Sequence, residues 1–240
     1  MKKTKQIVSL IDLTSLSDNE TIKEIEQLCK KADTKVAKTA SVCIYPRYIP
    51  YAKSFFKKSK IKNVKVATVV NFPHGNADID VVLREVKASI AYGADEVDLV
   101  FPYKALMSGD EKSGYKLVQK AKNICKKEKV LLKVIIESGE LKSPKLIKKA
   151  SEISIKAGAD FIKTSTGKVK VNATLKAAKV MLQAIKESKK RVGFKAAGGI
   201  KDKKTALKYL ELAENIMGKK YINKKYFRFG ASSLLDDLLS

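Results

Sequence analysis

Short apolar runs alternate with amphipathic stretches along the whole chain. Runs rich in Val, Ile and Leu are typical of buried strands, whereas apolar residues spaced three and four apart predict helices that cover a core. One such helix follows Ser143-Pro144, with an N-cap, a first-turn proline and a stop at Gly158. We expect eight strands, at Val8–Leu13, Lys35–Ile44, Val64–Asn71, Glu96–Val100, Val130–Glu137, Asp160–Thr164, Val192–Ala196 and Tyr226–Phe229.

Eight strand-and-helix units within 240 residues predict an α/β fold, a (β/α)8 TIM barrel that forms a single domain over residues 1–240. The turns at Tyr92–Asp95 and Lys156–Asp160 have similar sequences, as expected for a repeated unit. A doubly wound open sheet is the alternative. No G-x-G-x-x-G motif follows the first strand, which counts against the dinucleotide-binding form of that sheet.

Charged residues occupy one face of several predicted strands. Successive side chains of a strand point to opposite sides, so the apolar face packs on the helices and the other face points to the barrel axis. Barrel interiors are mostly filled by branched apolar residues, and buried charges are costly unless they are paired. The inward-pointing charges are Glu96, Asp98, Lys133, Glu137, Lys163 and Lys195.

Two interpretations of these inward charges stay open. Three lysines and three carboxylates can form a purely structural ion network. Asp98, Lys163 and Lys195, however, lie toward the C-terminal ends of their strands, where barrel enzymes hold their catalytic groups. For these three residues we favour a chemical role.

A buried lysine at such a position can act as a nucleophile. A neutral amine attacks a carbonyl carbon and forms a Schiff base, but an ordinary lysine has a pKa near 10.4. Lowering that pKa to about 7 requires roughly 4.6 kcal/mol, which burial and a neighbouring cation can supply. We expect Lys163 to be the nucleophile, Lys195 the cation that tunes it, and Asp98 the group that positions water or moves a proton.

The loops after the last three predicted strands form a second pattern. They contain Thr166-Gly167-Lys168, Ala197-Gly198-Gly199 and Gly230-Ala231-Ser232-Ser233, and a short helix is predicted over residues 234–239. Each loop alone is explained by ordinary turn chemistry. Barrels often bind phosphate with these loops and the start of a short helix, so three such loops together favour a phosphate site.

Three residues near the ends of the first two strands are candidate accessory groups. Asp12 and Thr14 end the first strand, where they either contact substrate or support Lys195. Cys43 ends the second strand; we interpret it as a small buried hydrophobic residue, although a thiol there could react with an aldehyde.

Composition narrows the class of protein. The 50 basic and 25 acidic residues give a net charge of +25, which raises the prospect of a nucleic-acid partner. Nearly all the basic residues are lysines spread over the predicted helices, whereas nucleic-acid-binding proteins usually rely on arginine. We therefore favour a lysine-rich surface that is simply solvated. The three cysteines lack metal-ligand spacing, and no apolar run predicts a membrane span or a signal peptide. We expect reduced thiols in a cytoplasmic protein.

Eight segments of the chain resemble one known enzyme family. They are "DLTSL", "TASVCIYPRYIP", "NFPHGN", "YGADEVDLVFPY", "LLKVIIESGEL", "AGADFIKTSTGK", "GFKAAGG" and "RFGASSLL". Their order and spacing, from about Leu10 to Leu239, are similar to those of the deoxyribose-phosphate aldolases.

This resemblance implies a function as well as a fold. It implies a metal-free class I aldolase without a cofactor, which reversibly cleaves 2-deoxy-D-ribose 5-phosphate to acetaldehyde and D-glyceraldehyde 3-phosphate in deoxyribose phosphate catabolism. It assigns the Schiff base to Lys163, the second active-site lysine to Lys195 and the proton relay to Asp98. It also implies a homodimer that binds a phosphosugar and neither nucleic acid nor membrane. Its phosphate contacts fall on Thr166, Gly167, Lys168, Gly198, Gly199, Gly230, Ser232 and Ser233.

The sequence departs from the family pattern at two places. Ala196 stands where the family commonly has proline, which relaxes the backbone beside Lys195. The sequence ends at Ser240, whereas some relatives have a longer tail with a terminal tyrosine, so we expect proton transfer to depend on Asp98, Lys195 and water. The rival functions are a basic nucleic-acid-binding protein and a phosphosugar isomerase without covalent catalysis.

Overall fold

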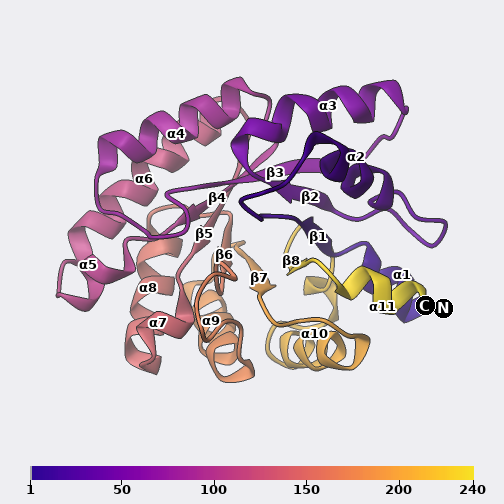
Figure 1. The fold of residues 1–240 in the computed structure, drawn as a ribbon. Coiled ribbons are helices and arrows are strands. Elements are labelled where there is room, and N and C mark those ends of the chain that lie inside the picture. Colours follow the sequence, from indigo (N-terminus) through magenta and orange to yellow (C-terminus); the bar gives the residue numbers. More distant parts are fainter. Residues whose placement is uncertain (1) are drawn as a thin grey trace.

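The computed structural model describes residues 2–240 and contains a closed barrel of eight parallel strands, in the order β1-β2-β3-β4-β5-β6-β7-β8 (Figure 1). The predicted (β/α)8 barrel is therefore confirmed and the open sheet is wrong. The strands are β1 (Ile11–Thr14), β2 (Ser41–Ile44), β3 (Lys65–Val70), β4 (Glu96–Val100), β5 (Leu131–Ile135), β6 (Phe161–Lys163), β7 (Gly193–Ala197) and β8 (Phe227–Ala231).

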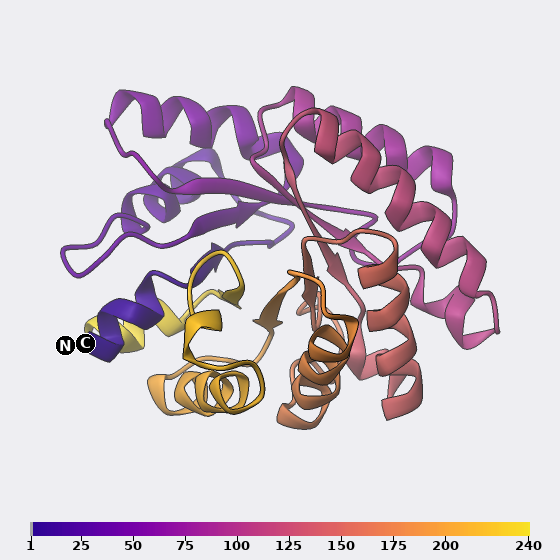
Figure 2. The same ribbon diagram turned by 180° about the vertical axis from the view of Figure 1, so that it is seen from behind.

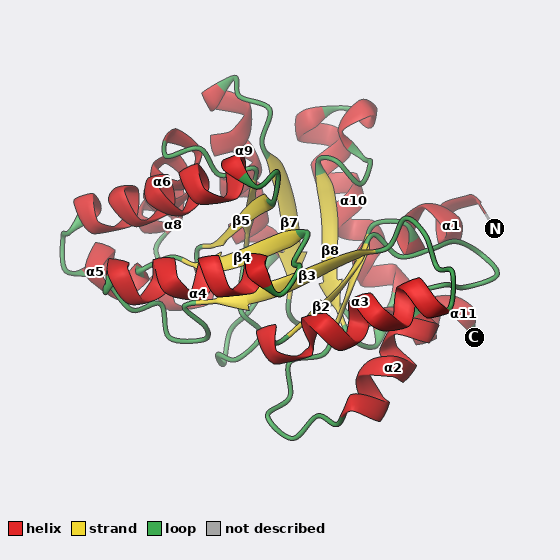
Figure 3. Ribbon diagram, turned by 90° about the horizontal axis from the view of Figure 1, so that it is seen from above, coloured by secondary structure: helices red, strands yellow, loops and turns green. Residues whose placement is uncertain are grey.

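Helices surround the strands on all sides, as the view from above shows (Figure 3). The terminal helices α1 and α11 lie side by side where the barrel closes between β1 and β8 (Figures 1 and 2). The helices are α1 (Lys2–Val8), α2 (Ile22–Lys31), α3 (Ile49–Lys58), α4 (Ile79–Ala91), α5 (Tyr103–Met107), α6 (Glu111–Lys127), α7 (Ser138–Leu141), α8 (Pro144–Lys156), α9 (Leu175–Ser188), α10 (Lys203–Met217) and α11 (Leu234–Leu239), with 3-10 turns η1 (Pro46–Tyr48) and η2 (Lys219–Tyr221).

Two predicted strands begin later than expected because their first residues belong to a helix or to a turn. Val8 ends α1, where it is buried, so the apolar run that begins there belongs partly to a helix. Residues 35–40 precede β2 as a turn in which the Thr34 hydroxyl accepts hydrogen bonds from the amides of Val36 and Ala37. Such a side-chain turn competes with strand pairing.

Several helices begin as the sequence predicts. The Asp78 side chain accepts a hydrogen bond from the Val81 amide at the start of α4, which satisfies one of the free N–H groups of the first turn. Ser143 is the N-cap of α8, as predicted, but its side chain makes no capping hydrogen bond. Pro144 favours the start of this helix instead, because its fixed φ suits the first turn and it has no N–H group that needs a hydrogen-bond partner.

The two similar turns hold the N-terminal ends of the strands. Gly93 and Gly158 precede Asp95 and Asp160 with φ of +100° and +102°, values that favour glycine. The Asp95 carboxylate accepts hydrogen bonds from the Val66 amide of β3 at 2.8 Å and from Lys53 of α3 at 2.6 Å. The repeated sequence is therefore a repeated arrangement, in which the aspartate after the turn joins a helix to the neighbouring strand.

The N-terminal layer of the barrel interior contains an aromatic ring. Phe161 of β6 is buried, and the residue in register with it on β7 is Gly193. A Cβ atom at Gly193 would lie 2.4 Å from the Phe161 ring, so glycine is required for the ring to fit.

Candidate active site

Three cations stand in one row across neighbouring strands. Lys163 of β6 is in register with Lys195 of β7, and Lys195 is in register with Arg228 of β8. All three are buried, with at most 4% of the residue exposed. Because like charges at this spacing repel, the row requires carboxylates from the other strands.

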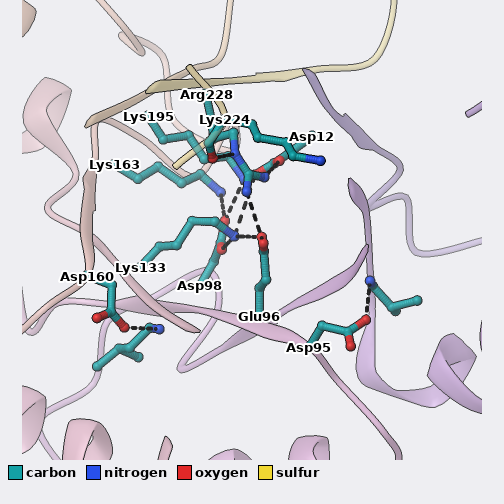
Figure 4. A network of polar contacts seen from close by, with 12 residues as sticks. Asp12, Asp95, Glu96, Asp98, Lys133, Asp160, Lys163, Lys195, Lys224 and Arg228 are labelled. Atoms are coloured by element: carbon teal, nitrogen blue, oxygen red, sulfur yellow. Dashed lines mark hydrogen bonds and ion pairs between the residues drawn. The ribbon is translucent and has the colours of Figure 1, made fainter. Parts of the chain in front are cut away.

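Asp98 of β4 is the carboxylate that three ammonium groups share (Figure 4). Its Oδ2 atom lies 2.9 Å from Nζ of Lys163 and 2.8 Å from Nζ of Lys195. Its Oδ1 atom lies 2.7 Å from Nζ of Lys133, the residue in register with it on β5. Asp98 thus fixes the position of both lysines of the row.

Asp12 and Glu96 complete the cluster on its other side (Figure 4). Asp12 of β1 contacts Lys195 through Oδ2 at 2.6 Å and Arg228 through Oδ1 at 2.6 Å. Glu96 contacts Arg228 at 3.1 Å and Lys133 at 2.7 Å. Lys133 also lies 3.5 Å from Asp12. We call these seven residues the charge cluster: Asp12, Glu96, Asp98, Lys133, Lys163, Lys195 and Arg228.

The contacts of the charge cluster outweigh the effect of burial on protonation. Burial alone would raise the pKa of Asp98, but Lys133, Lys163 and Lys195 hold it well below its usual range. Burial alone would lower the pKa of Lys195, but the carboxylates of Asp12 and Asp98 raise it above its ordinary value. Lys195 is therefore held as an ammonium ion, in agreement with its predicted role as a cation beside Lys163.

Lys163 is the member of the charge cluster that lines the cleft at the C-terminal end of the barrel. This cleft has a volume of about 290 Å³. Asp98 and Lys195 are fully buried and form no part of its wall. The wall is formed by Thr14, Leu16, Lys163, Thr166, Gly167, Lys168, Ala197, Gly198, Gly199, Ile200, Lys201, Gly230, Ala231, Ser232 and Ser233.

The far part of this cleft is suited to an anion. Within residues 2–240, the amides of Gly167, Gly198, Gly199, Ser232 and Ser233 donate no hydrogen bond to the protein. Lys168 and Lys201 add two ammonium groups to the same wall. Gly198 and Gly199 have φ of +88° and +82°, a conformation that turns the backbone at the end of β7 and favours glycine.

A family model described as "DeoC/LacD family aldolase" matches residues 6–240. The chain belongs to this family. It is an aldolase.

Solved structures agree with this aldolase over its whole length. A tetrameric deoxyribose phosphate aldolase from Aeropyrum pernix is 25% identical, with a TM-score of 0.80, and the match covers 100% of this chain and 94% of that one. A protein with the provisional name deoxyribose-phosphate aldolase from Coccidioides immitis is 26% identical (TM-score 0.86; 99% and 87% covered). A protein with the same provisional name from Toxoplasma gondii ME49 is 23% identical (TM-score 0.91; 99% and 93% covered) and supports the fold.

The structure brings together most of the residues that the sequence singled out. Lys163, Lys195 and Asp98 meet through shared contacts below 3 Å. All eight residues expected to contact phosphate line one cleft with Lys163 and Thr14. They are Thr166, Gly167, Lys168, Gly198, Gly199, Gly230, Ser232 and Ser233.

The accessory candidates divide between the cleft and the core. Thr14 lines the cleft, and its hydroxyl donates a hydrogen bond to the Asp12 carbonyl at 2.8 Å. Asp12 is buried against Lys195, so of its two expected roles the support of that lysine fits the geometry. Cys43 packs in a small apolar cluster with Leu16 and Val69, and burial raises the pKa of its thiol.

Glu137 corrects the predicted set of inward charges. Strand β5 ends at Ile135, and Glu137 adopts a left-handed conformation with φ of +53°. Its carboxylate accepts the Thr166 amide at 3.2 Å and contacts none of the lysines of the charge cluster. Strand alternation ceases to apply where the strand ends, which is why the pattern placed Glu137 with the cluster.

Sequence reasoning missed Arg228 and Lys201. The alternation of Phe227, Arg228 and Phe229 in β8 was the available signal for Arg228, because it leaves the guanidinium on the inner face. Lys201 follows the Gly198-Gly199 turn and was not separable from other surface lysines by pattern. No helix within residues 2–240 meets the length and apolarity required to span a membrane, and no group of His, Cys, Asp and Glu there has a metal-binding arrangement.

Proposed function

We propose that this aldolase reversibly cleaves 2-deoxy-D-ribose 5-phosphate to acetaldehyde and D-glyceraldehyde 3-phosphate through a Schiff base on Lys163. The observation that carries the proposal is the position of Lys163, which lines the anion-suited cleft and lies 2.9 Å from Asp98. The other cations of the cluster are enclosed by protein. Lys163 is thus the cluster amine that a carbonyl carbon in the cleft can reach.

The chemistry begins with imine formation. Nζ of Lys163 attacks C1 of the open-chain sugar phosphate and gives a carbinolamine. Loss of hydroxide as water requires one proton at that oxygen, which Lys195 and a water supply. Asp98 is held ionised, so we assign it the positioning of both lysines and of that water.

The protonated imine then accepts the electrons of the broken bond. A base removes the proton of the C3 hydroxyl and the C2–C3 bond breaks. D-glyceraldehyde 3-phosphate leaves, and C3 of the sugar becomes its aldehyde carbon. The electron pair passes into the enamine, which takes a proton at C2. Water then hydrolyses the imine, frees acetaldehyde and returns the Lys163 amine. No cofactor enters this sequence.

The phosphate group anchors the substrate away from the reacting carbons. The free amides of the three C-terminal loops and the ammonium groups of Lys168 and Lys201 supply donors for it. Binding energy at the phosphate orients the aldehyde carbon at Lys163, which raises the reaction rate as well as the affinity.

Reductive trapping tests the proposal. Borohydride added with acetaldehyde should convert the imine to a stable N-ethyl lysine, and peptide mass analysis should map it to Lys163 well before other lysines react. Lys163→Ala is the control for slow labelling elsewhere. Labelling spread evenly over the lysines, with turnover intact in Lys163→Ala, would remove the assignment and favour a barrel enzyme without covalent catalysis.

Location and assembly form part of the same proposal. We place the reaction in the cytoplasm, which the three buried free cysteines support. We expect a homodimer, as the family resemblance implies, whereas the relative from Aeropyrum pernix is described as tetrameric. Light scattering of the purified protein distinguishes the two assemblies.

A further inference from the structure

The charge cluster contains one more cation than carboxylate. Lys133, Lys163, Lys195 and Arg228 carry four positive charges when protonated, and Asp12, Glu96 and Asp98 carry three negative charges. The seven residues are at most 4% exposed, and an unmatched charge in such surroundings is unfavourable. The loss of one proton removes the imbalance. One of the four cations is the source of this proton.

We infer that Arg228, a residue outside the cleft, makes Lys163 the group that loses its proton, by supplying the surplus positive charge of the cluster. This inference rests on the proposed function, because it explains how the Schiff-base lysine becomes a nucleophile. It makes Arg228 a residue that acts on the chemistry through charge alone, by way of Asp12 and Lys195.

The contacts of the four cations identify Lys163 as the weakest-held ammonium. Arg228 contacts Asp12 and Glu96, and an arginine does not lose its proton in proteins. Lys195 contacts two carboxylates and Lys133 contacts three. Lys163 contacts Asp98 alone, on the oxygen that it shares with Lys195. Deprotonation of Lys163 leaves three cations matched to three carboxylates.

Every strand that faces Lys163 is included in this count. Asp98 and Glu96 come from β4, Lys195 from β7, Arg228 from β8, Asp12 from β1 and Lys133 from β5. Four further titratable groups lie outside the charge cluster: Cys43 of β2, Glu137 after β5, and Lys168 and Lys201, whose ammonium groups line the same cleft as Lys163. Burial raises the pKa of Cys43 and of Glu137. Cys43 packs in a small apolar cluster, and the Glu137 carboxylate accepts the Thr166 amide; within residues 2–240 neither group forms an ion pair with a cation of the charge cluster.

Arg228 has no direct path to the substrate. It is 4% exposed, its Nε donates to the Lys224 carbonyl, and it forms no part of the cleft wall. It also makes no contact with Asp98, in contrast to Lys133 and Lys195. Its replacement therefore changes the charge of the cluster without removing a group that holds Lys163.

The test is the pH dependence of the initial rate of borohydride trapping with excess acetaldehyde, in the full-length protein. Arg228→Met should move the midpoint to higher pH by about one unit and slow trapping at pH 7 about tenfold, with the limiting rate at high pH retained. The sign follows because removal of the surplus charge lets Lys163 keep its proton. Arg228→Lys keeps the charge and should keep the midpoint near that of the wild type.

Neutralisation of Glu96, a carboxylate partner of Arg228, gives the decisive control. Glu96→Gln should move the midpoint to lower pH, since it increases the surplus, and the double variant Arg228→Met/Glu96→Gln should return it toward the wild-type value. A purely structural role for Arg228 predicts instead that the second substitution adds damage. Arg191→Met, which removes an exposed guanidinium, should leave the midpoint in place.

The possible outcomes separate the inference from the proposed function. Absence of any Lys163 adduct in the wild type would overturn the proposed function and this inference with it. An adduct whose midpoint is unmoved in Arg228→Met would overturn the inference alone. If Arg228→Met fails to fold, Glu96→Gln decides, because a midpoint that is unmoved or shifted to higher pH in that variant contradicts the surplus-charge argument.

Discussion

The two ends of the barrel use acidic residues in different ways. At the N-terminal end, Asp95 and Asp160 each accept hydrogen bonds from one amide of the neighbouring strand at 2.8 Å and from one lysine at 2.6 Å, which lies in the helix before that neighbouring strand. In the charge cluster each carboxylate is shared by two or more cations. Local pairing neutralises charge and serves the fold, whereas in the charge cluster four cations share three carboxylates.

The ion pairs of the two regions also differ in their exposure to solvent, and therefore in energy. The side chains of the Lys122–Asp160 pair are 20% and 34% exposed, whereas those of Lys133 and Asp98 are 0% exposed. Exposed pairs are screened and contribute about 0–1 kcal/mol. Removing one partner of a buried pair leaves an uncompensated charge and costs about 3–5 kcal/mol. The two regions should therefore respond very differently to equivalent substitutions.

The largest effect is expected from Lys163→Ala. Loss of the nucleophile should reduce aldol cleavage by about a thousandfold or more while circular dichroism stays native-like. Lys122→Ala removes a lysine that is also paired with an aspartate, but at the N-terminal end, and should keep most of the turnover. A coupled assay for glyceraldehyde 3-phosphate measures both variants. Equal losses in the two variants would remove the functional distinction between the ends.

Lys133→Met should be the most destabilising of these changes. It removes the ammonium group that Asp98 and Glu96 share and leaves their negative charges without it. We therefore expect the free energy of unfolding to fall by about 3–5 kcal/mol. Lys122→Met is the matched control, with an expected loss of about 1 kcal/mol or less. Urea denaturation at pH 7 compares the two. Similar losses would show that burial does not separate the two kinds of pair.

Lys168→Ala tests the anion-suited part of the cleft. We expect KM for 2-deoxyribose 5-phosphate to rise about tenfold, while cleavage of unphosphorylated 2-deoxyribose changes little, because the proposed contact of the ammonium group is with the phosphate alone. Lys170→Ala, two residues away and outside the cleft wall, is the control. An equal effect on both sugars would place Lys168 at the reacting end instead.

The smallest effect is expected from Asp160→Asn. The amide oxygen can still accept the Leu132 N–H, so only the pairing with Lys122 is lost, and the unfolding free energy should fall by about 0.5–1 kcal/mol. High salt should shrink the difference from the wild type. Asp95→Asn should behave in the same way, and a changed rate of imine trapping in either variant would contradict the division between the two ends.

The strand pattern predicted the fold and the centre of the site for a simple physical reason. Hydrophobic periodicity and strand alternation are local properties, and they suffice to place Asp98, Lys163 and Lys195 on the inner face of a barrel. The glycine-containing loops lie at the C-terminal end of the strands by connectivity alone. For the same reason the pattern failed at Glu137, where the backbone leaves the strand conformation.

The amino-acid sequence by itself determined the order of eight strands and helices, the inward direction of the Asp98, Lys163 and Lys195 side chains, and the loops that surround the cleft. Only the tertiary structure decided which charges meet. Asp12 and Arg228 lie at opposite ends of the chain and come within 2.6 Å because β1 pairs with β8 when the barrel closes. Ion pairing depends on that closure and on the register between strands, and neither is encoded in any local stretch of residues.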